Sequence, residues 1–272
     1  MAAPSLRQLL RQRRARSGGA PLCGTWSLLG SVSAAQTLAG QGFDFVVIDR
    51  EHSDLTTRDA SGIAAALAAR GVAPAVRIPR LDHDGKSVMR ALDCGCATVV
   101  VPNVRNADEV SRAVQASLFP PLGNRGCNPF VPAASLTPQF DCLAMVEEQN
   151  ATAMVVPIIE NAEAVRNIES IVAVKGLHAL LFGPFDLSIS LGDGGIRTPR
   201  VEQMIRHSVD CALRAGVEPI MPVFGSDVAA AGQAAELWCD RGVICFTVGI
   251  DSAFLAQRSG AFLQAVTSRS TP

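Results

Sequence analysis

The sequence predicts an α/β protein whose eight parallel strands form a (β/α)8 TIM barrel. Short apolar, β-branched runs alternate with longer Ala- and Leu-rich segments of helical period. The runs are continuously apolar, which indicates strands covered on both faces, as in a parallel sheet. Eight such strand–helix units in a chain of 272 residues fit a closed barrel better than an open doubly wound sheet. No GxGxxG motif follows the first strand, which disfavours a dinucleotide-binding fold.

Each predicted strand is a short apolar run bounded by polar or turn-forming residues. The runs are PLCGTW (21–26), FDFVVID (43–49), APAVRIP (73–79), ATVVVP (97–102), AMVVPIIE (153–160), HALLFG (178–183), EPIMPVF (218–224) and VICFTVG (243–249). We expect one domain over residues 1–272, with an N-terminal helix at about 5–16 and a C-terminal helix at about 251–267. The long connection at 120–137 exceeds an ordinary loop, which favours a functional role.

Charge and cysteine content argue against several classes of protein. The 24 basic residues are balanced by 25 acidic ones, so no nucleic-acid surface is expected. The one basic run, RQLLRQRRAR at 7–16, predicts a solvated helix that caps the fold rather than a membrane or targeting helix, because no apolar segment follows it. Eight irregularly spaced cysteines predict free, buried thiols in a cytoplasmic protein. Cys211, Cys239 and Cys245 lie in apolar runs, and Cys94-Gly-Cys96 is too close for the usual zinc spacing.

Polar residues gather at the carboxyl ends of four predicted strands. They are Asp49, Glu51, His52, Arg77, Glu160 and Asp186. Active sites of TIM barrels lie at this end, so the side chains are expected to form one site.

Two carboxylates on neighbouring strand ends, Glu160 and Asp186, suit an oxygen-preferring ion such as Mg²⁺ or Mn²⁺. The alternative is that both residues merely cap the helices that follow them.

Asp49 and His52 are three residues apart on a strand-end loop. A carboxylate that holds one imidazole nitrogen would leave the other free as a general base. The alternative is a satisfied pair without chemistry.

Arg77 ends an apolar strand, where a guanidinium is costly to bury without an anion. It suits a carboxylate or an enolate oxygen, or else an ion pair with Glu51 or Glu160. The GPFDLS turn offers backbone N–H groups at a helix start for a carboxylate. The only lysines, Lys86 and Lys175, are placed away from the expected mouth, which argues against a Schiff-base mechanism.

Taken together, the segments GFDFVVIDREH, AVRIPR, ALDCGCATVVVPNV, PPLGNRG, VVPIIENAEAVRNIESIVAVKGLHALLFGPFDLSISLG and VGIDSAFL resemble the HpcH/HpaI aldolase and citrate lyase family. The resemblance covers about residues 20–255 and is to the class II pyruvate aldolases of the 4-hydroxy-2-oxoheptanedioate aldolase type. It implies a barrel of the phosphoenolpyruvate/pyruvate-binding type, a homo-oligomer (a trimer or hexamer), and exchange of the last helix between partners.

The resemblance also implies roles for single residues. Glu160 and Asp186 would hold a divalent ion (Mg²⁺, Mn²⁺ or Co²⁺) that chelates pyruvate. Arg77 would steady the enolate oxygen, and the His52–Asp49 pair would move protons at the aldol hydroxyl. The further site residues are those of the turn that holds the pyruvate carboxylate, together with two candidates on the first and second strand ends. They are Gly183, Pro184 and Phe185, with Trp26 and Glu51.

Three departures from the type aldolases concern the acceptor half. Ile158 replaces a glutamine, Arg50 fills a position that is often small or uncharged, and the long loop lacks an arginine that many relatives carry near Pro132. The expected function is metal-dependent cleavage and formation of a carbon–carbon bond between a 2-oxo acid and an aldehyde. The alternatives are a citrate-synthase-like enzyme that uses oxaloacetate and a barrel retained as a non-catalytic binding subunit.

Overall fold

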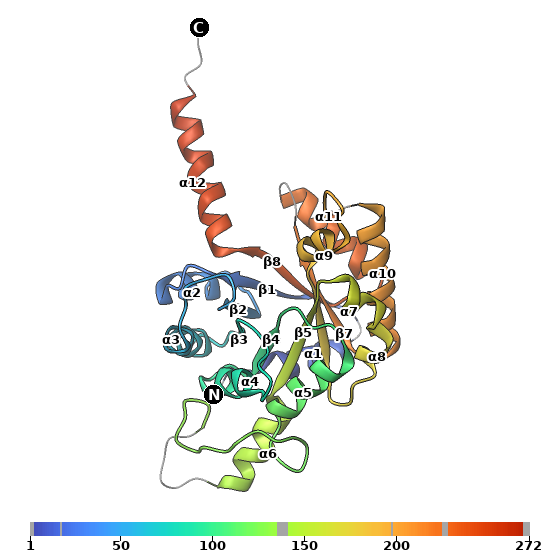
Figure 1. Cartoon of the computed structure of the whole chain (residues 1–272). Helices are drawn as coiled ribbons and strands as arrows, with labels where there is room; N and C mark the ends of the chain where they lie inside the picture. The colour runs from blue at the N-terminus through green and yellow to red at the C-terminus, as the bar shows by residue number, and fades with distance from the viewer. Residues whose placement is uncertain (1–2, 17, 135–140, 197, 225–227, 269–272) are drawn as a thin grey trace.

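Eight parallel strands pair in chain order, and β8 closes the barrel against β1 (Figure 1). The computed structural model describes residues 3–16, 18–134, 141–196, 198–224 and 228–268. The strands are β1 (Leu22–Ser27), β2 (Phe45–Asp49), β3 (Ala73–Arg77), β4 (Thr98–Val101), β5 (Met154–Ile159), β6 (Ala179–Phe182), β7 (Glu218–Val223) and β8 (Cys245–Ile250). The predicted TIM barrel is therefore confirmed, with every strand within two residues of its expected bounds.

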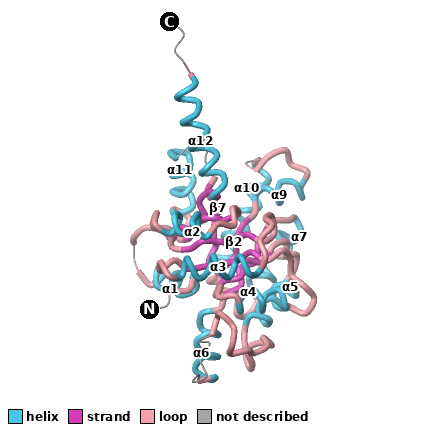
Figure 2. The backbone as a smooth tube through the Cα atoms, turned by 90° about the vertical axis from the view of Figure 1, so that its left-hand side faces the viewer, coloured by secondary structure: helices cyan, strands magenta, loops and turns pink. Residues whose placement is uncertain are grey.

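Most of the helices surround the strands on the outside of the barrel (Figure 2). The described helices are α1 (Leu6–Arg14), α2 (Val32–Ala39), α3 (Thr57–Ala68), α4 (Lys86–Asp93), α5 (Ala107–Ser117), α6 (Cys142–Thr152), α7 (Ala162–Arg166), α8 (Ile168–Val172), α9 (Pro184–Leu191), α10 (Pro199–Arg214), α11 (Val228–Cys239) and α12 (Asp251–Thr267). None of the described helices is long and apolar enough to cross a membrane.

Apolar side chains form two clusters, one between the sheet and the helices and one inside the barrel. Phe45 and Ile158 belong to the inner cluster, and Leu6 and Leu10 of α1 also belong to it. A Cβ on Gly24 would lie 2.4 Å from the ring of Phe45, its register partner, so only glycine leaves room for that ring. The inside of the barrel is thus a packed core, and α1 closes its end at the starts of the strands, which we call the N-terminal rim.

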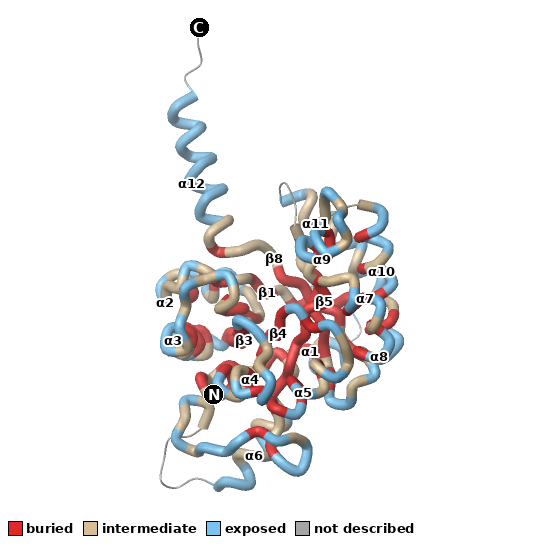
Figure 3. Tube along the Cα trace, in the orientation of Figure 1, coloured by how far each residue is buried: buried red, intermediate tan, exposed pale blue. Residues whose placement is uncertain are grey.

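The last helix, α12, leaves the barrel instead of packing on it (Figures 1 and 3). It carries large apolar side chains in solvent: Phe254 and Leu255 are 36% and 62% exposed, and Phe262, Leu263 and Val266 are 63%, 65% and 79% exposed. The apolar side chains of α12 are therefore not covered by the barrel of the same chain.

The cysteines are free, as predicted, but they are not uniformly buried. Cys211 and Cys245 are buried, whereas the expectation for Cys239 was wrong, because it is exposed at the end of α11. No residue of α11 is buried, so an apolar sequence there did not imply burial. Cys94 and Cys96 are buried at the end of α4, in keeping with a structural role.

Candidate active site

A cavity of about 290 Å³ opens at the carboxyl ends of the strands, which we call the mouth. Its apolar walls include Trp26, Leu28, Ile158, Leu181, Phe182, Pro222, Phe224 and Ile250. Its polar side chains are Asp49, His52, Arg77, Glu160 and Asp186. The structure thus brings the polar residues singled out in the sequence to one place, with Glu51 joined to them through Arg77.

Arg77 is the most strongly held of these side chains. It ends β3 directly beside Asp49 at the end of β2, because the two residues are register partners. Its Nε donates to Asp49 Oδ1 at 2.9 Å and its Nη2 to Asp49 Oδ2, while Nη1 lies 3.0 Å from Glu51 Oε2. The guanidinium also lies over the ring of Trp26, 4.7 Å from the centroid. These bonds do not use every guanidinium N–H, so Arg77 enters the cavity fixed in position with donors left over.

Asp49 is fully buried and would be costly to ionise without partners. Burial acts to raise its pKa, but the guanidinium of Arg77 and the N–H groups of Glu51 and His52 outweigh burial and hold the pKa below its usual value. Those N–H groups donate to Asp49 Oδ1 at 2.9 and 3.3 Å. Asp49 is therefore an ionised carboxylate whose main partner is Arg77.

The predicted pairing of Asp49 with the imidazole of His52 was wrong. Asp49 bonds to the backbone of His52, and the ring points elsewhere, with its side chain 62% exposed. The nearest carboxylate to His52 Nε2 is Glu51, at 3.8 Å, which is beyond hydrogen-bond length. Burial raises the pKa of Glu51, although Arg77 and His52 oppose the rise. The His52 ring is therefore open to solvent at the edge of the cavity, with Glu51 as its acidic neighbour.

Glu160 is 7% exposed and follows β5. Its Oε1 accepts a hydrogen bond from the N–H of Asn103 at 2.5 Å. Burial above all, and then the nearby carboxylates of Asp186 and Glu51, raise its pKa to about 7 against the pull of Asn103. Asn161 rather than Glu160 caps α7, accepting from the N–H of Ala164, so the capping alternative fails for Glu160.

Position 183 requires a glycine because Glu160 approaches its backbone closely. A Cβ at this position would lie 2.6 Å from Glu160 Cβ and 2.7 Å from Glu160 Oε2, so any side chain would displace the carboxylate. The Gly183 N–H donates to Ile159 O at 3.1 Å, and Pro184 has no N–H. Within the turn that was predicted to hold a carboxylate, these two residues therefore offer no free backbone donor. Gly183 instead leaves space for the carboxylate.

The start of α9 still offers donors, from Phe185 and Asp186. The first intrahelical bond is made by the N–H of Leu187 to Gly183 O, so these two N–H groups precede it. Asp186 lies in the first turn of α9 at the cavity wall, where the helix dipole favours a negative charge. The exposed ring of Phe185 packs edge-on against Phe224, with centroids 4.9 Å apart, and so closes one side of the mouth.

Two residues at the mouth were missed from the sequence. Asn103 follows β4 with a left-handed φ of 52°, a conformation that asparagine tolerates better than most residues. Asp251, 6% exposed after β8, accepts from the Ser27 hydroxyl at 3.0 Å and from the N–H groups of Leu28 and Leu29. Both follow strand ends, and this position was the signal available in VVVPNV and VGIDS.

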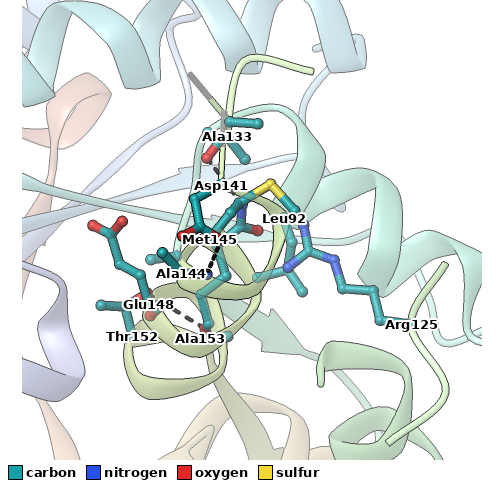
Figure 4. Close-up of a pocket in the computed structure, with 13 residues that line it drawn as sticks. Leu92, Arg125, Ala133, Asp141, Ala144, Met145, Glu148, Thr152 and Ala153 are labelled. Carbon is teal, nitrogen blue, oxygen red and sulfur yellow. Dashed lines mark hydrogen bonds between the residues drawn. The ribbon is translucent and has the colours of Figure 1, made fainter. Parts of the chain in front are cut away.

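The long connection after α5 lies at the N-terminal rim, away from the mouth of its own chain. Its Arg125 is paired with Asp93 at the end of α4, at 2.7 Å, and stacks over Phe119. Between the connection, α4 and α6 lies a separate cavity of about 380 Å³ (Figure 4). Residues 135–137 of the predicted connection fall outside the described residues. Within one chain its described part therefore cannot take part in the chemistry at the mouth.

Neither lysine lines the mouth cavity. Lys86 begins α4 and pairs with Asp84 at 2.9 Å, in solvent. Lys175 lies at the N-terminal rim. Among the described residues, the cavity thus offers carboxylates, an imidazole and a guanidinium, and no amine.

Comparison with known proteins shows which enzymes share this barrel. The model of the HpcH/HpaI aldolase/citrate lyase family matches residues 22–255. A hydroxypyruvate/pyruvate aldolase of Paraburkholderia phytofirmans is 33% identical over 255 residues, covering 91% of this chain and 94% of the relative. A 4-hydroxy-2-oxo-heptane-1,7-dioate aldolase of Shigella flexneri is 32% identical over 250 residues, covering 92% and 90%.

Among solved structures, citrate synthase SbnG superposes with a TM-score of 0.83 at 26% identity, covering 96% of this chain and 97% of that one. The protein is thus a carbon–carbon lyase on a TIM barrel. The chain belongs to the HpcH/HpaI aldolase/citrate lyase family.

Proposed function

We propose that this enzyme reversibly joins a 2-oxo acid, pyruvate or a close analogue, to an aldehyde, with the help of a divalent metal ion. The observation that carries the proposal is the convergence of Arg77, Glu160 and Asp186 on one cavity of about 290 Å³ that no lysine lines. A cavity of this size suits a small substrate. The names of the aldolase relatives support the reaction class.

The residues present fit a hard divalent ion. Glu160 and Asp186 face one cavity, and burial above all, together with repulsion from the carboxylate of Asp186, raises the pKa of Glu160 to about 7. A bound cation would relieve that repulsion. In the described part of the chain no group of three or more His, Cys, Asp or Glu side chains could hold a metal. Two carboxylates with positions left for water and substrate are typical of Mg²⁺ or Mn²⁺, and Co²⁺ is a further candidate.

When bound, the ion would supply Lewis-acid polarisation of the 2-oxo acid. The remaining steps belong to side chains and backbone. The unused N–H groups of Arg77 would donate to the enolate oxygen, where negative charge develops. The N–H groups of Phe185 and Asp186 at the start of α9 would hold the substrate carboxylate. Asp49 and Glu51 keep the guanidinium in place, so no reorganisation is needed as the charge forms.

His52 would give or take the proton of the aldol hydroxyl. Its exposed ring at the cavity edge is free to reach an acceptor that enters from solvent. Glu51, rather than Asp49, would stabilise the imidazolium when it forms, because Asp49 is engaged with Arg77. The enolate half and the proton-transfer half of the reaction are therefore served by different groups.

His52→Ala should separate these two halves. Decarboxylation of oxaloacetate needs an enolate stabiliser but no proton transfer at an aldol hydroxyl. We expect aldol cleavage to fall by about 100- to 10,000-fold, while much of any oxaloacetate decarboxylation survives. His83→Ala, an exposed loop histidine that does not line the cavity, is the matched control. Equal loss of both activities, with the metal still bound, would place His52 with the enolate instead.

Borohydride reduction in the presence of pyruvate should leave the protein unmodified and active. A Schiff base needs an amine at the reacting carbon, and the two lysines of the chain do not line the cavity. Intact-mass measurement before and after reduction checks this. A mass shift on Lys86 or Lys175 that follows the loss of activity would overturn the metal-dependent mechanism.

A second candidate reaction is condensation with oxaloacetate as the enolate donor. The likeness to citrate synthase SbnG favours it. Ile158, which lines the cavity in place of the glutamine of the type aldolases, is a difference from those aldolases in the acceptor half. A metal-supplemented screen of aldehydes and keto acids against pyruvate and oxaloacetate decides between the two. Carbon–carbon bond formation from oxaloacetate without loss of carbon dioxide would favour the citrate-synthase-like reaction.

We also propose that the chain forms a homo-oligomer, a trimer or hexamer, in which α12 packs on a partner copy. Leu255→Asp/Phe262→Asp should lower the mass measured by light scattering, because both side chains are more than half exposed on α12 and would be covered by a partner. Gln257→Asp, on the opposite face of the helix, is the control. An unchanged mass in the double variant would exclude α12 as the contact.

A further inference from the structure

A second cavity, of about 420 Å³, lies at the N-terminal rim beneath α1. Its walls come from α1 and from the starts of β5, β6 and β7. Arg7, Arg11 and Arg14 line it from α1, where their spacing places them along one face of the helix. His178 and Glu218 line it from the barrel. We call it the rim cavity. It is lined by arginines of the basic run at 7–16, which has no role in the proposed function.

The arginines of the rim cavity outnumber their counterions. Glu218 is fully engaged by Arg14, whose Nε donates to Oε1 at 2.7 Å and whose Nη2 bonds Oε2. Among the described residues Arg7 donates only to the backbone carbonyls of Asn150 and Ala153, at 2.8 and 3.1 Å, and its buried Nε has no partner there. The guanidinium of Arg11 makes no ion pair or hydrogen bond with any described residue. Arg7 and Arg11 therefore line one cavity whose single carboxylate, Glu218, is paired with Arg14.

The positive charges of Arg7 and Arg11 contribute to lowered pKa values in the rim cavity. Burial and then Arg11 lower the pKa of Arg7. Burial, followed by Arg7 and Arg11, lowers the pKa of His178 to about 4, so its ring is neutral at physiological pH. Within the described residues this ring makes no hydrogen bond, and it faces the same cavity. Among the described residues, the two guanidinium groups lack a counterion and the imidazole lacks a hydrogen-bond partner. A bound anion would supply both.

We infer that the rim cavity binds the phosphate group of a small phosphate monoester through Arg7, Arg11 and His178. Two unpaired guanidinium groups balance a dianion, and a phosphate monoester carries close to two negative charges at neutral pH, unlike a single carboxylate. Guanidinium groups match phosphate oxygens in charge and geometry. The volume lies within the range of small-molecule sites.

A neighbouring cavity gives room for the organic part of the ester. It shares Arg7 and His178 with the rim cavity and has Lys175 and Asp108 as its other charged groups. The apolar interior of the barrel separates both cavities from the mouth, so this site is distinct from the proposed aldolase site and independent of its chemistry. Because Leu6 and Leu10 anchor α1 in the core, an anion that joins α1 to the strands would also stabilise the closed end of the barrel.

Calorimetry and thermal unfolding of the full chain with inorganic phosphate and with glycerol 3-phosphate test this inference, against sodium chloride at matched ionic strength. We expect saturable binding and a rise in Tm with both phosphates and not with chloride. Arg11→Gln should weaken binding by about tenfold or more, since it removes charge-assisted hydrogen bonds. Arg16→Gln removes the same charge just beyond α1, from an exposed residue outside the cavity, and should have little effect.

The titration of His178 provides a second measurement that does not depend on a variant. Its proton NMR signal, assigned by its loss in His178→Gln, should titrate near pH 4 in chloride and at higher pH in phosphate, because an adjacent dianion favours the imidazolium. Equal weakening by Arg16→Gln, an unmoved His178 titration, or binding of succinate as tight as that of the phosphates would each overturn the inference.

Discussion

Glu160→Gln and Asp186→Asn should each abolish metal-dependent turnover while the barrel remains folded. Both changes keep the shape of the side chain and remove the charge that a divalent ion needs. Loss of groups that only support metal ligands costs about 10- to 100-fold, so loss of a ligand should exceed the upper figure. Glu163→Gln, an exposed carboxylate on α7 close to Glu160 in the chain, is the matched control and should keep full activity. Full turnover by chelator-treated protein would remove the metal from the mechanism.

The ionisation of Glu160 gives the same prediction a readout without turnover. Its pKa is raised from 4.5 to about 7 in the folded chain, so folding favours the protonated form of this carboxyl group. This site therefore contributes stability below pH 4.5, and the contribution is lost as pH rises through about 7. In metal-free protein Glu160→Gln should remove that loss, as thermal unfolding across this pH range would show. In the unsubstituted protein Mg²⁺ should bind more weakly below pH 7, because proton and ion compete for one carboxylate.

The barrel could be predicted from the sequence because its signals are local. Short, β-branched, continuously apolar runs such as FVVI and TVVV favour strands covered on both faces, and the alternation with helices then favours parallel pairing. The same reasoning placed Asp49, Arg77 and Glu160 at one end, since parallel strands all end on the same rim. No knowledge of side-chain contacts was needed for either step.

Contacts between side chains could not be predicted in this way. Asp49 and His52 are close in sequence, which suggested a carboxylate–imidazole pair, but strand register sets Asp49 beside Arg77 instead. This pairing joins residues 28 positions apart in the chain, so the spacing of residues within one loop does not reveal it. The sequence also did not show which N–H groups of the GPFDLS turn are free, because the N–H of Gly183 donates to the neighbouring strand. Asn103 escaped notice because its role rests on a backbone N–H and a left-handed φ.

Arg77→Ala should lose both aldol cleavage and oxaloacetate decarboxylation, and it should also destabilise the fold. Removing a donor to a developing negative charge typically costs about 100- to 1000-fold in rate. Unlike His52, Arg77 serves the enolate oxygen, whose charge appears whichever bond is broken. Its loss also leaves Asp49 buried and unpaired, with a side chain only 1% exposed. Breaking one partner of a buried pair costs about 3–5 kcal/mol of unfolding free energy, which urea denaturation would measure.

The two effects of Arg77 can be separated by a second substitution. Asp49→Asn in the Arg77→Met background removes the orphaned charge, so much of the lost unfolding free energy should return, because a buried ion pair can be replaced by uncharged groups at little cost. Activity should not return, since no guanidinium faces the cavity. Arg77→Lys keeps the charge but cannot match the two oxygens of Asp49 together with Glu51, so it should recover stability only in part. If the double variant regained turnover along with stability, Arg77 would be a counterion of Asp49 and nothing more.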